Sequence, residues 1–408
     1  MKPRPDLRTE QSPKWLEIFQ LTAEVNVPSS HLYMEAQVFT PDSKRLILHR
    51  SAHPHGSDKH DPKHQYLVCD LEDGGRLTPI TEELGATAAS VSPDGRFLYY
   101  FVDETEPGAG RLTLKRVGMD GTDRQTLLVL DGPIPGSDFR FSRAYPLSTI
   151  SSDGKRLALS GFLGDGRTER APWGLLVFDL DQASVQLVIH GETWCNMHPQ
   201  YSRSLDSDES HDILIQENHG NHCDASGRCI TLVSGDGADI HVIRDDGANF
   251  RNLPWGRDGN EYCQGHQCWR GRSSRAITST ANRARGEEQL IEGTIAPFAG
   301  HIGIKTPGGS RNDLSRSVPS PHFYHFATDI AGRRLITDAN YKLGGEIYIA
   351  DLPSAEDGPL SNVTFLLNTR LVPKKSNHSH PFLSPDGTMG FFNSDEGGIL
   401  QAYMCRGW

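Results

Sequence analysis

The sequence predicts an all-β chain folded as one seven-bladed β-propeller with four-stranded blades. Two observations carry this prediction. A short turn-and-strand motif recurs along nearly the whole chain, and the composition is rich in turn-forming residues, with 41 Gly and 25 Pro among 408 residues. A chain of this length contains either several domains or one large repeat architecture. Because the repeat is regular, we expect residues 1–408 to form a single domain.

The repeated motif is a tight turn followed by an alternating strand. The clearest copies of the turn are Ser92–Gly95 and Ser384–Gly387, both with the sequence Ser-Pro-Asp-Gly, which is typical of tight turns. Equivalent positions in the seven copies are Asp42, Asp94, Asp153, Asp208, Arg272, Gly332 and Asp386. Successive positions are 52 to 64 residues apart, a spacing that suits one four-stranded blade per copy.

The main structural alternative is a pair of tandem β-sandwiches, which the even spacing over the whole length disfavours. The turn sequences resemble those of TolB-like propeller blades, and the Gly-His and Trp-Asp signature of WD repeats is absent. Ring-shaped folds need a strand that joins the two ends of the chain. We expect the N-terminal segment 1–22 to close the ring, with a strand from residues 15–22 beside the C-terminal blade.

Composition narrows the choice of partners and compartment. The net charge is −11 and no block of Lys and Arg occurs, so we expect no nucleic-acid partner. No apolar segment follows Met1 and no run of 18 apolar residues occurs, so we expect a cytoplasmic protein without a membrane partner. The seven Cys are an odd number, and in a reducing compartment all of them would be free thiols.

Histidine is the most informative residue type, with 18 copies. The turns of four consecutive repeats are each preceded by histidine: His198, His266, His325, and the pair His378 and His380. The start of the innermost strand of a propeller blade faces the central funnel, so these imidazoles are predicted to converge on one pocket. Residues two apart in an extended segment point to the same side, so the last pair suits metal chelation. On spacing alone, an ordinary polar strand pair fits equally well.

These residues also carry a resemblance to a known family. The chain resembles the oligogalacturonate lyases, which are cytoplasmic seven-bladed propellers of pectin breakdown, over most of its length. The similar segments are His31–Tyr33 with Phe39–Asp42, His198–Tyr201, Gly265–Trp269, Lys375–Pro381 and Gln401–Met404. The resemblance implies a carbon–oxygen lyase that acts on acidic oligosaccharides.

The resemblance also implies a metal centre. In that family three His and one Gln bind a divalent ion, typically Mn²⁺, and another His is the base. Carried over, His266, His378 and His380 are the metal ligands and His198 is the base. Lys375 stands where the family has its Gln, so either three His and water hold the metal or Lys375 supplies the positive charge.

Other residues could fill the vacant ligand position or take part in the reaction. Gln264 and Asn377 are alternatives for the missing Gln ligand. The implied reaction is β-elimination, in which a cation on the uronate carboxylate acidifies the C5 proton and a neutral His removes it. Tyr145 and His222 are further candidates for the acid or base. The residues predicted to bind substrate are Arg140, Arg143, His325 and Lys375.

Three other functions remain open at this stage. A non-catalytic TolB-like propeller that binds protein or peptide is the leading alternative, although such a scaffold needs no convergent imidazoles. A glycoside hydrolase needs paired carboxylates, and no Asp or Glu pair is placed as well as the histidines. A zinc site could draw on His219, His222 and His266 with the cysteines, but their spacings match no standard zinc motif. The cysteines concerned are Cys223, Cys229, Cys263 and Cys268. His53 and His55 are interpreted as part of a solvated loop, with metal binding as a minor alternative.

Overall fold

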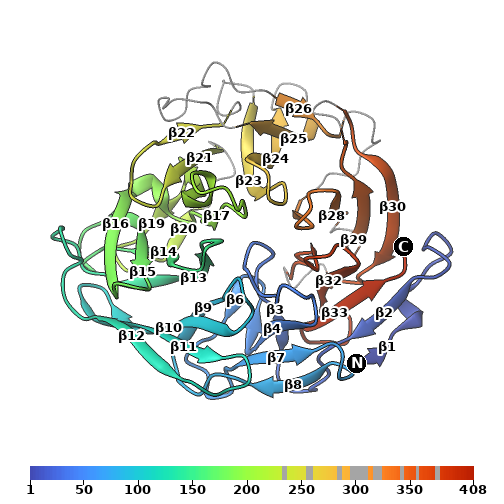
Figure 1. Cartoon of the computed structure of the whole chain (residues 1–408), viewed down its shortest axis with the longest axis horizontal. Coiled ribbons are helices and arrows are strands. Elements are labelled where there is room, and N and C mark those ends of the chain that lie inside the picture. Colours follow the sequence, from blue (N-terminus) through green and yellow to red (C-terminus); the bar gives the residue numbers. More distant parts are fainter. Residues whose placement is uncertain are drawn as a thin grey trace.

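The computed structural model is an all-β ring of sheets arranged around a central axis (Figure 1). It describes residues 1–231, 237–253, 261–282, 287–294, 311–315, 324–340, 344–354, 358–372 and 377–408. Helical structure in these ranges is limited to three 3-10 segments, η1 (Pro5–Leu7), η2 (Glu192–Trp194) and η3 (Glu209–His211). None of the described helices is long and apolar enough to cross a membrane. The predicted β-propeller architecture is confirmed.

Four of the sheets contain four antiparallel strands each, with the first strand nearest the axis (Figure 1). The first comprises β3 (Ser29–His31), β4 (Arg45–Arg50), β7 (Tyr66–Asp70) and β8 (Arg76–Pro79). The second comprises β9 (Ala86–Val91), β10 (Phe97–Glu106), β11 (Ala109–Gly118) and β12 (Gln125–Leu130). The third comprises β13 (Arg143–Ile150), β14 (Arg156–Phe162), β15 (Trp173–Asp179) and β16 (Ser184–Gly191). The last comprises β27 (Phe326–Thr328), β28 (Arg334–Ala339), β29 (Glu346–Asp351) and β30 (Ser361–Asn368).

The number of sheets differs from the prediction. The described residues form six main sheets, because the fourth and fifth predicted repeats share one sheet of eight strands. Its strands are β17 (Gln200–Tyr201), β18 (Asp212–Asn218), β21 (Ala238–Arg244), β22 (Arg251–Asn252), β23 (Glu261–Trp269), β24 (Arg275–Asn282), β25 (Glu287–Thr294) and β26 (Arg311–Asp313). The two halves meet where Ala238 of β21 pairs with Cys263 of β23. The prediction of seven separate four-stranded sheets is therefore wrong.

The sixth sheet joins the two ends of the chain. It comprises β1 (Lys2–Pro3), β2 (Glu17–Gln20), β33 (Gln401–Arg406), β32 (Met389–Ser394) and β31 (Phe382–Leu383). The N-terminal strand β2 runs antiparallel to the C-terminal strand β33, with Ile18 opposite Cys405. Both side chains are buried. Strands from opposite ends of the sequence therefore hold the ring closed.

Two small hairpins lie outside the main sheets: β5 (Ala52–His53) with β6 (Gly56–Ser57), and β19 (His222–Cys223) with β20 (Cys229–Thr231). The first hairpin continues from the first sheet, and the second lies within the connection between β18 and β21. Both carry residues of the central cavity described below.

The Ser-Pro-Asp-Gly turns share one hydrogen-bond pattern. The Ser92 hydroxyl donates to Oδ1 of Asp94 at 2.6 Å, and the Ser92 carbonyl accepts from the amide of Gly95 at 2.8 Å. Gly95 has a φ of 71°, a conformation that glycine adopts without strain. The same serine–aspartate bond recurs in the last copy, between Ser384 and Asp386. The local chemistry of the repeat therefore sets each turn.

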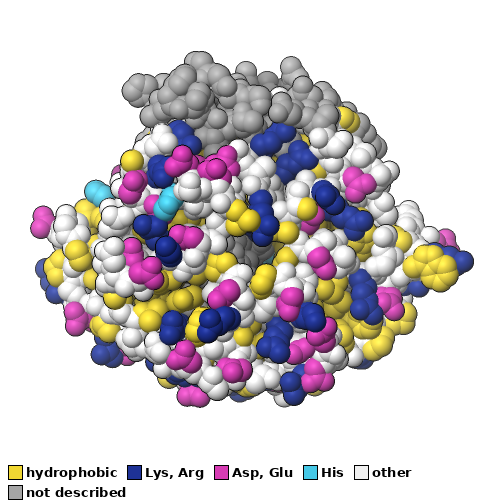
Figure 2. Space-filling view, viewed as in Figure 1, with side chains coloured by type: hydrophobic (Ala, Val, Ile, Leu, Met, Phe, Trp, Pro, Cys, Tyr) yellow, Lys and Arg dark blue, Asp and Glu magenta, His cyan; other side chains and the backbone are white. Residues whose placement is uncertain are grey.

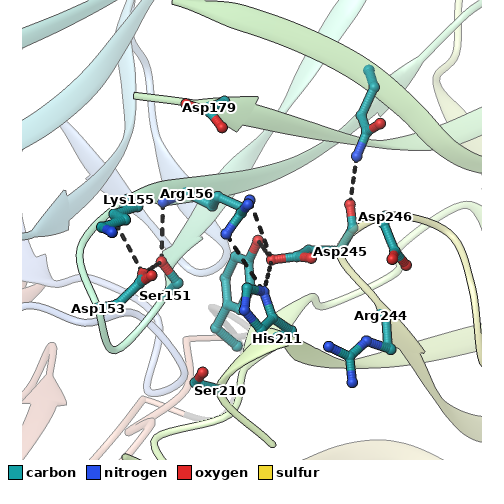
Figure 3. A network of polar contacts seen from close by, with 12 residues as sticks. Ser151, Asp153, Lys155, Arg156, Asp179, Ser210, His211, Arg244, Asp245 and Asp246 are labelled. Atoms are coloured by element: carbon teal, nitrogen blue, oxygen red, sulfur yellow. Dashed lines mark hydrogen bonds and ion pairs between the residues drawn. The ribbon is translucent and has the colours of Figure 1, made fainter. Parts of the chain in front are cut away.

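The hydrophobic core lies between neighbouring sheets. Phe101 of β10 packs against Phe178 of β15, with ring centroids 5.0 Å apart. Polar contacts also cross between sheets, as at Asp245, which follows β21 (Figure 3). Its carboxylate lies 2.9 Å from Nδ1 of His211 and 3.6 Å from Nε of Arg156 on β14. The sheets are thus fixed to one another by side chains.

One face of the molecule is hollowed at the centre of the ring, with apolar and Lys or Arg side chains around the hollow (Figure 2). At the end of the ring where the turns lie, a cavity of about 310 Å³ is lined by Pro41, Pro93 and Pro385 together with Arg203 and Arg272. The larger cavity, described next, is lined by a different set of residues.

Ring closure gives a first testable expectation. Replacing Ile18 by Ala removes a side chain that is 3% exposed, so the free energy of unfolding should fall by about 2–5 kcal/mol. Urea unfolding followed by tryptophan fluorescence would measure the change. Val25 is 82% exposed, so Val25→Ala is the matched control and should change this free energy by less than about 0.5 kcal/mol. Equal effects of the two substitutions would contradict the closing role of β2.

Candidate active site

The larger cavity has a volume of about 950 Å³, and its lining includes nine histidines and two tyrosines. Its walls come from the starts of the innermost strands, from the hairpin β5–β6 and from the segment next to β20. The histidines that line it are His49, His53, His55, His60, His198, His266, His325, His378 and His380. Cavities that combine convergent polar groups with apolar walls are the usual location of small-molecule sites.

The backbone turns several of these side chains inward through an uncommon conformation. His198 has a φ of 51° and His380 a φ of 43°, in the left-handed region that non-glycine residues rarely adopt. Gly265, with a φ of 92°, occupies the position before His266. That backbone conformation favours glycine, and a Cβ atom at Gly265 would also lie 2.8 Å from Nε2 of Gln216. Strained backbone of this kind is typical of functional sites.

Three imidazoles form a group that could hold a metal ion. His55, His378 and His380 each offer a ring nitrogen, and these nitrogens lie within 4.8 Å of one another. His378 and His380 are two of the three ligands predicted from the sequence. The third member, His55, lies between β5 and β6, in the segment that we had interpreted as a solvated loop. The hairpin brings it to the cavity wall, 5.2 Å from His378 between ring centroids.

His325 lies at the centre of the histidine cluster. Its ring centroid is 4.4 Å from those of His266 and His380 and 5.1 Å from that of His378. Nδ1 of His325 faces the buried Asp338 carboxylate at 3.1 Å, and the Ser379 hydroxyl donates to the same oxygen at 2.6 Å. A carboxylate behind an imidazole is the usual support of a metal-binding histidine, because it fixes the tautomer and the ring orientation. His325 was predicted to bind substrate, and its geometry also suits a ligand.

The cluster favours neutral imidazoles. Burial, followed by the neighbouring His325, lowers the pKa of His266 and His380 well below the usual value and lowers that of His378 to about 3. Among the described residues, Nδ1 of His266 and Nε2 of His380 are buried and have no hydrogen-bond partner. Neutral nitrogens with free lone pairs are what a divalent metal requires. The residues present therefore fit a metal ion.

A second group of polar residues lies beside the histidines. Nδ1 of His198 is 2.9 Å from the buried carboxylate of Glu35, and Nε2 is 3.0 Å from the hydroxyl of Tyr145. That hydroxyl donates to Oδ1 of Asn196 at 2.9 Å. Burial raises the pKa of both Glu35 and Tyr145. The four residues form a continuous hydrogen-bonded chain of the kind that moves protons.

Tyr33 connects the two groups. Its ring centroid lies 5.0 Å from that of His198, 4.7 Å from that of His380 and 6.4 Å from that of His325. Tyr33 and Glu35 both follow β3; Tyr33 lines the cavity, and Glu35 lies behind His198. In the sequence, Tyr33 stood out only within a resembling segment, and no motif singled out Glu35.

Cationic side chains also line the cavity. Arg143 is exposed there, and Lys59 and Arg228 line other parts of the wall. Lys59 also forms an ion pair with the buried Asp103. Asp58 is the acidic residue among those that line the cavity. Within the described part of the chain, this wall is therefore suited to an anionic ligand.

Two residues predicted for the site, Arg140 and His222, do not line the cavity. Arg140 does not line the cavity, because its guanidinium donates to the carbonyl of Asp131 at 3.2 Å. His222 belongs to β19 and is also absent from the lining. The predicted roles of these two residues have no support in the structure. Lys375 and the side chain of Gln264 lie outside the described residues. The amide of Asn377 donates to Asp395 at 2.8 Å and is held in that contact.

The cysteines are not arranged as the zinc-site alternative requires. Cys223 and Cys229 lie with Cys195, and the three sulfur atoms are within 4.8 Å of one another. Cys195 and Cys229 line the cavity. Cys263 and Cys268 lie on β23 in two separate core clusters and take no part in this group. None of the seven cysteines, all of which lie in the described part of the chain, forms a disulfide bond.

Several solved structures share this architecture. An oligogalacturonate lyase in complex with manganese matches with a TM-score of 0.68 and 16% identity over 100% of this chain and 96% of that chain. The fold is that of the oligogalacturonate lyases. The lyase from Vibrio parahaemolyticus gives a TM-score of 0.67 and 15% identity over 97% of this chain and 95% of that chain.

A more distant likeness extends to a different enzyme class. A prolyl endopeptidase matches with a TM-score of 0.52 and 13% identity over 92% of this chain and 50% of that chain. No family model and no curated protein sequence matches the chain. The resemblance noted in the sequence is thus confirmed at the level of the fold.

The histidine cluster predicts a pH dependence of stability. An unfolded histidine gains a proton near pH 6.5, whereas burial keeps His378 neutral in the folded state down to a pKa of about 3. Lowering the pH below 6.5 should therefore favour the unfolded state, by about 1.4 kcal/mol per pH unit for each such imidazole.

The test is urea unfolding in EDTA at several pH values. His378→Gln should flatten the fall in the free energy of unfolding between about pH 6 and pH 4 by about 1.4 kcal/mol per unit. Above about pH 7.5, where both states are neutral, the two curves should run parallel. Equal slopes in the acidic range would contradict burial of a neutral imidazole at this position.

Proposed function

We propose that the protein is a lyase that cleaves uronate-containing oligosaccharides by metal-assisted β-elimination. The observation that carries this proposal is the cavity itself, which combines a cluster of neutral imidazoles with a separate proton-transfer chain. An acidic oligosaccharide of the oligogalacturonate type is the proposed substrate. The likeness in fold to oligogalacturonate lyases, one of them in complex with manganese, supports the proposal.

The proposed metal site is built on His55, His378 and His380, with His266 and His325 beside them. A divalent ion, Mn²⁺ by preference, would neutralise the uronate carboxylate there and so acidify the proton on C5. The low pKa of His378 and His380 keeps both nitrogens available as ligands at neutral pH. Asp338 holds His325 in a fixed orientation toward the same region.

The proposed base is His198 acting with Tyr145. When Glu35 is ionised it accepts the proton of Nδ1, which leaves Nε2 of His198 free to accept a proton from the Tyr145 hydroxyl. The tyrosine oxygen can then take the C5 proton as its own proton passes to His198. The electron pair left on C5 then forms the C4–C5 double bond as the C4–O4 bond breaks. The departing oxygen takes the proton that Tyr145 removed from C5, and His198 returns its proton to the tyrosine oxygen. Because burial raises the pKa of Tyr145, it acts as a base only with His198 behind it.

The remaining features concern the substrate and the scaffold. Arg143 and Arg228 on the cavity wall are proposed to bind carboxylates of neighbouring sugar units. We also propose that the eight-stranded sheet acts as two blades, which gives the ring its seven repeats. Seven free thiols suit a reducing compartment and support a cytoplasmic location.

The direct test is an absorbance assay near 235 nm, roughly the region of a conjugated unsaturated uronate, the expected product of the β-elimination. Oligogalacturonates and other uronate oligosaccharides would be supplied with Mn²⁺ or with EDTA. We expect growth of the signal that EDTA abolishes and Mn²⁺ restores. Growth that ignores EDTA would indicate that Lys375 replaces the metal. No growth on any uronate, from folded protein, would contradict the lyase and favour a protein-binding propeller.

Substitution of the proposed base pair separates catalysis from metal binding. Tyr145→Phe and His198→Gln should each lower kcat/KM by about 10²- to 10⁴-fold, while Mn²⁺ affinity measured by calorimetry stays unchanged. Tyr348 lies on β29 and donates to Glu346 at 2.7 Å, so Tyr348→Phe is a control that should keep full activity. Full activity in Tyr145→Phe would rule out the proposed relay.

Substitution of the proposed metal ligands should weaken Mn²⁺ binding, which the substitutions of the base pair leave unchanged. His378→Ala and His55→Ala should each weaken Mn²⁺ binding by at least about tenfold. His190→Ala, on the outer strand β16, is the matched control. Unchanged Mn²⁺ affinity in both ligand variants would place the metal elsewhere.

A further inference from the structure

A second cluster of metal-binding side chains lies outside the central cavity, on the strands β18 and β21. It consists of Glu217 near the end of β18, His219 just after that strand, and Asp239 and His241 from the start of β21. Glu217 is paired directly with Asp239 across the two strands, and His241 lies two residues further along the same face. We call these four residues the β18–β21 cluster.

The cluster faces away from the larger cavity. Gln216 and Asn218 line that cavity, and side chains alternate between the two faces of a strand, so Glu217 points to the opposite face. On that face Ile213 and Ile215 pack against Trp173 of the third sheet. The cluster is therefore a separate site and does not depend on the proposed function.

Three of these side chains, Glu217, His219 and Asp239, direct ligand atoms toward one another, and these atoms all lie within 4.8 Å of one another. Nε2 of His219 lies 2.7 Å from Oδ2 of Asp239 and 3.8 Å from Oε2 of Glu217. Oε2 of Glu217 lies 3.4 Å from Nε2 of His241. Ligands at about 2.0–2.1 Å from a tetrahedral metal ion are about 3.3 Å from one another. The observed separations bracket this value.

Two of these atoms lack the partners that buried polar atoms normally have. Glu217 is 5% exposed and His241 is 1% exposed at their side chains. Among the described residues, neither Oε2 of Glu217 nor Nε2 of His241 makes a hydrogen bond. Buried polar atoms without a partner are rare and often mark an ion that the coordinates do not include. Both atoms point into the cluster.

The remaining contacts hold the ligand atoms in position. Nδ1 of His241 lies 2.8 Å from the amide oxygen of Asn252, so Nδ1 carries the proton and Nε2 keeps its lone pair for the cluster. The hydroxyl of Thr193 donates to the other carboxylate oxygen of Glu217. The described contacts of Glu217 include no Lys or Arg. Among the described residues only His219 and His241 are in ion-pair contact with it, and a cation bound beside them would offset its buried negative charge.

We propose that Glu217, His219 and Asp239 bind a divalent transition-metal ion, Zn²⁺ by preference, with His241 beside Glu217. One imidazole and two carboxylates in a compact arrangement, with water in the fourth position, suit tetrahedral zinc. The ion would join β18 to β21 at the point where the eight-stranded sheet begins. Since Gln216 and Asn218 lie on the same strand and line the cavity, the ion would also hold that part of the cavity wall.

The test is to count bound zinc in the full chain after removal of metal and dialysis against micromolar Zn²⁺, by mass spectrometry of the metal. Glu217→Gln and His219→Asn should each lose one zinc per chain, or bind it at least about tenfold more weakly. The double variant His378→Ala/His380→Ala should keep this zinc. Binding of Co²⁺ in that double variant should give the visible absorption of tetrahedral cobalt, without the strong ultraviolet band of thiolate ligands.

The matched control is His211→Ala, which removes an imidazole that also faces a buried carboxylate, that of Asp245, in the same sheet (Figure 3). This variant should keep the zinc. Circular dichroism identifies any variant that fails to fold, and the two cluster variants are independent of each other. The proposal is overturned if folded Glu217→Gln and His219→Asn bind as much zinc as the wild type. It is also overturned if the wild type binds zinc only through His378 and His380.

Discussion

The antiparallel pairing of β2 with β33 is the contact on which the rest of the structure depends. A propeller built from successive sheets has two open ends, and an open ring would leave strand edges unpaired. Here strands from the two ends of the chain lie in one sheet and bury Ile18 against its neighbours. The cavity has walls from all around the ring, so its geometry exists only when the ring is closed.

Within the closed ring, desolvation determines the chemistry of the cavity. Burial disfavours charge on an imidazole, and it also disfavours charge on the carboxyl group of Glu35. The two effects produce neutral nitrogen donors on one side of Tyr33 and a proton-transfer chain on the other. Separation of these two tasks is what metal-assisted proton abstraction requires.

The sequence predicted the architecture well because the repeats share the same kind of turn residues as well as a similar spacing. The Ser-Pro-Asp-Gly turns form the same hydrogen bonds in each copy, so their spacing reports directly on the sheets. The count of sheets was wrong because the pairing of Ala238 with Cys263 merges two repeats, and a single pair of this kind leaves no pattern in the sequence. The site residues that recur at the same place in successive repeats, such as His198 and His380, were predicted from the sequence.

Residues brought in from outside the repeat could not be identified in the same way. His55 reaches the cavity on the hairpin β5–β6, and its sequence surroundings are those of an exposed polar loop. Glu35 is a single carboxylate 163 positions from its partner His198. The one available signal was its position two residues after Tyr33, in the segment that follows β3. The prediction that Arg140 binds substrate has no support, because its guanidinium donates to a nearby backbone carbonyl.

The left-handed backbone at His198 and His380 lowers stability at two positions where the proposed activity needs a histidine. A glycine, or an asparagine, would adopt these conformations at lower energetic cost than a histidine does. Selection for stability alone would therefore replace both imidazoles. A lineage that lost its substrate would be expected to drift toward Gly or Asn at these two positions first, while its turns and its ring closure stayed intact. Natural variants at positions 198 and 380 would thus record whether the cavity is still in use.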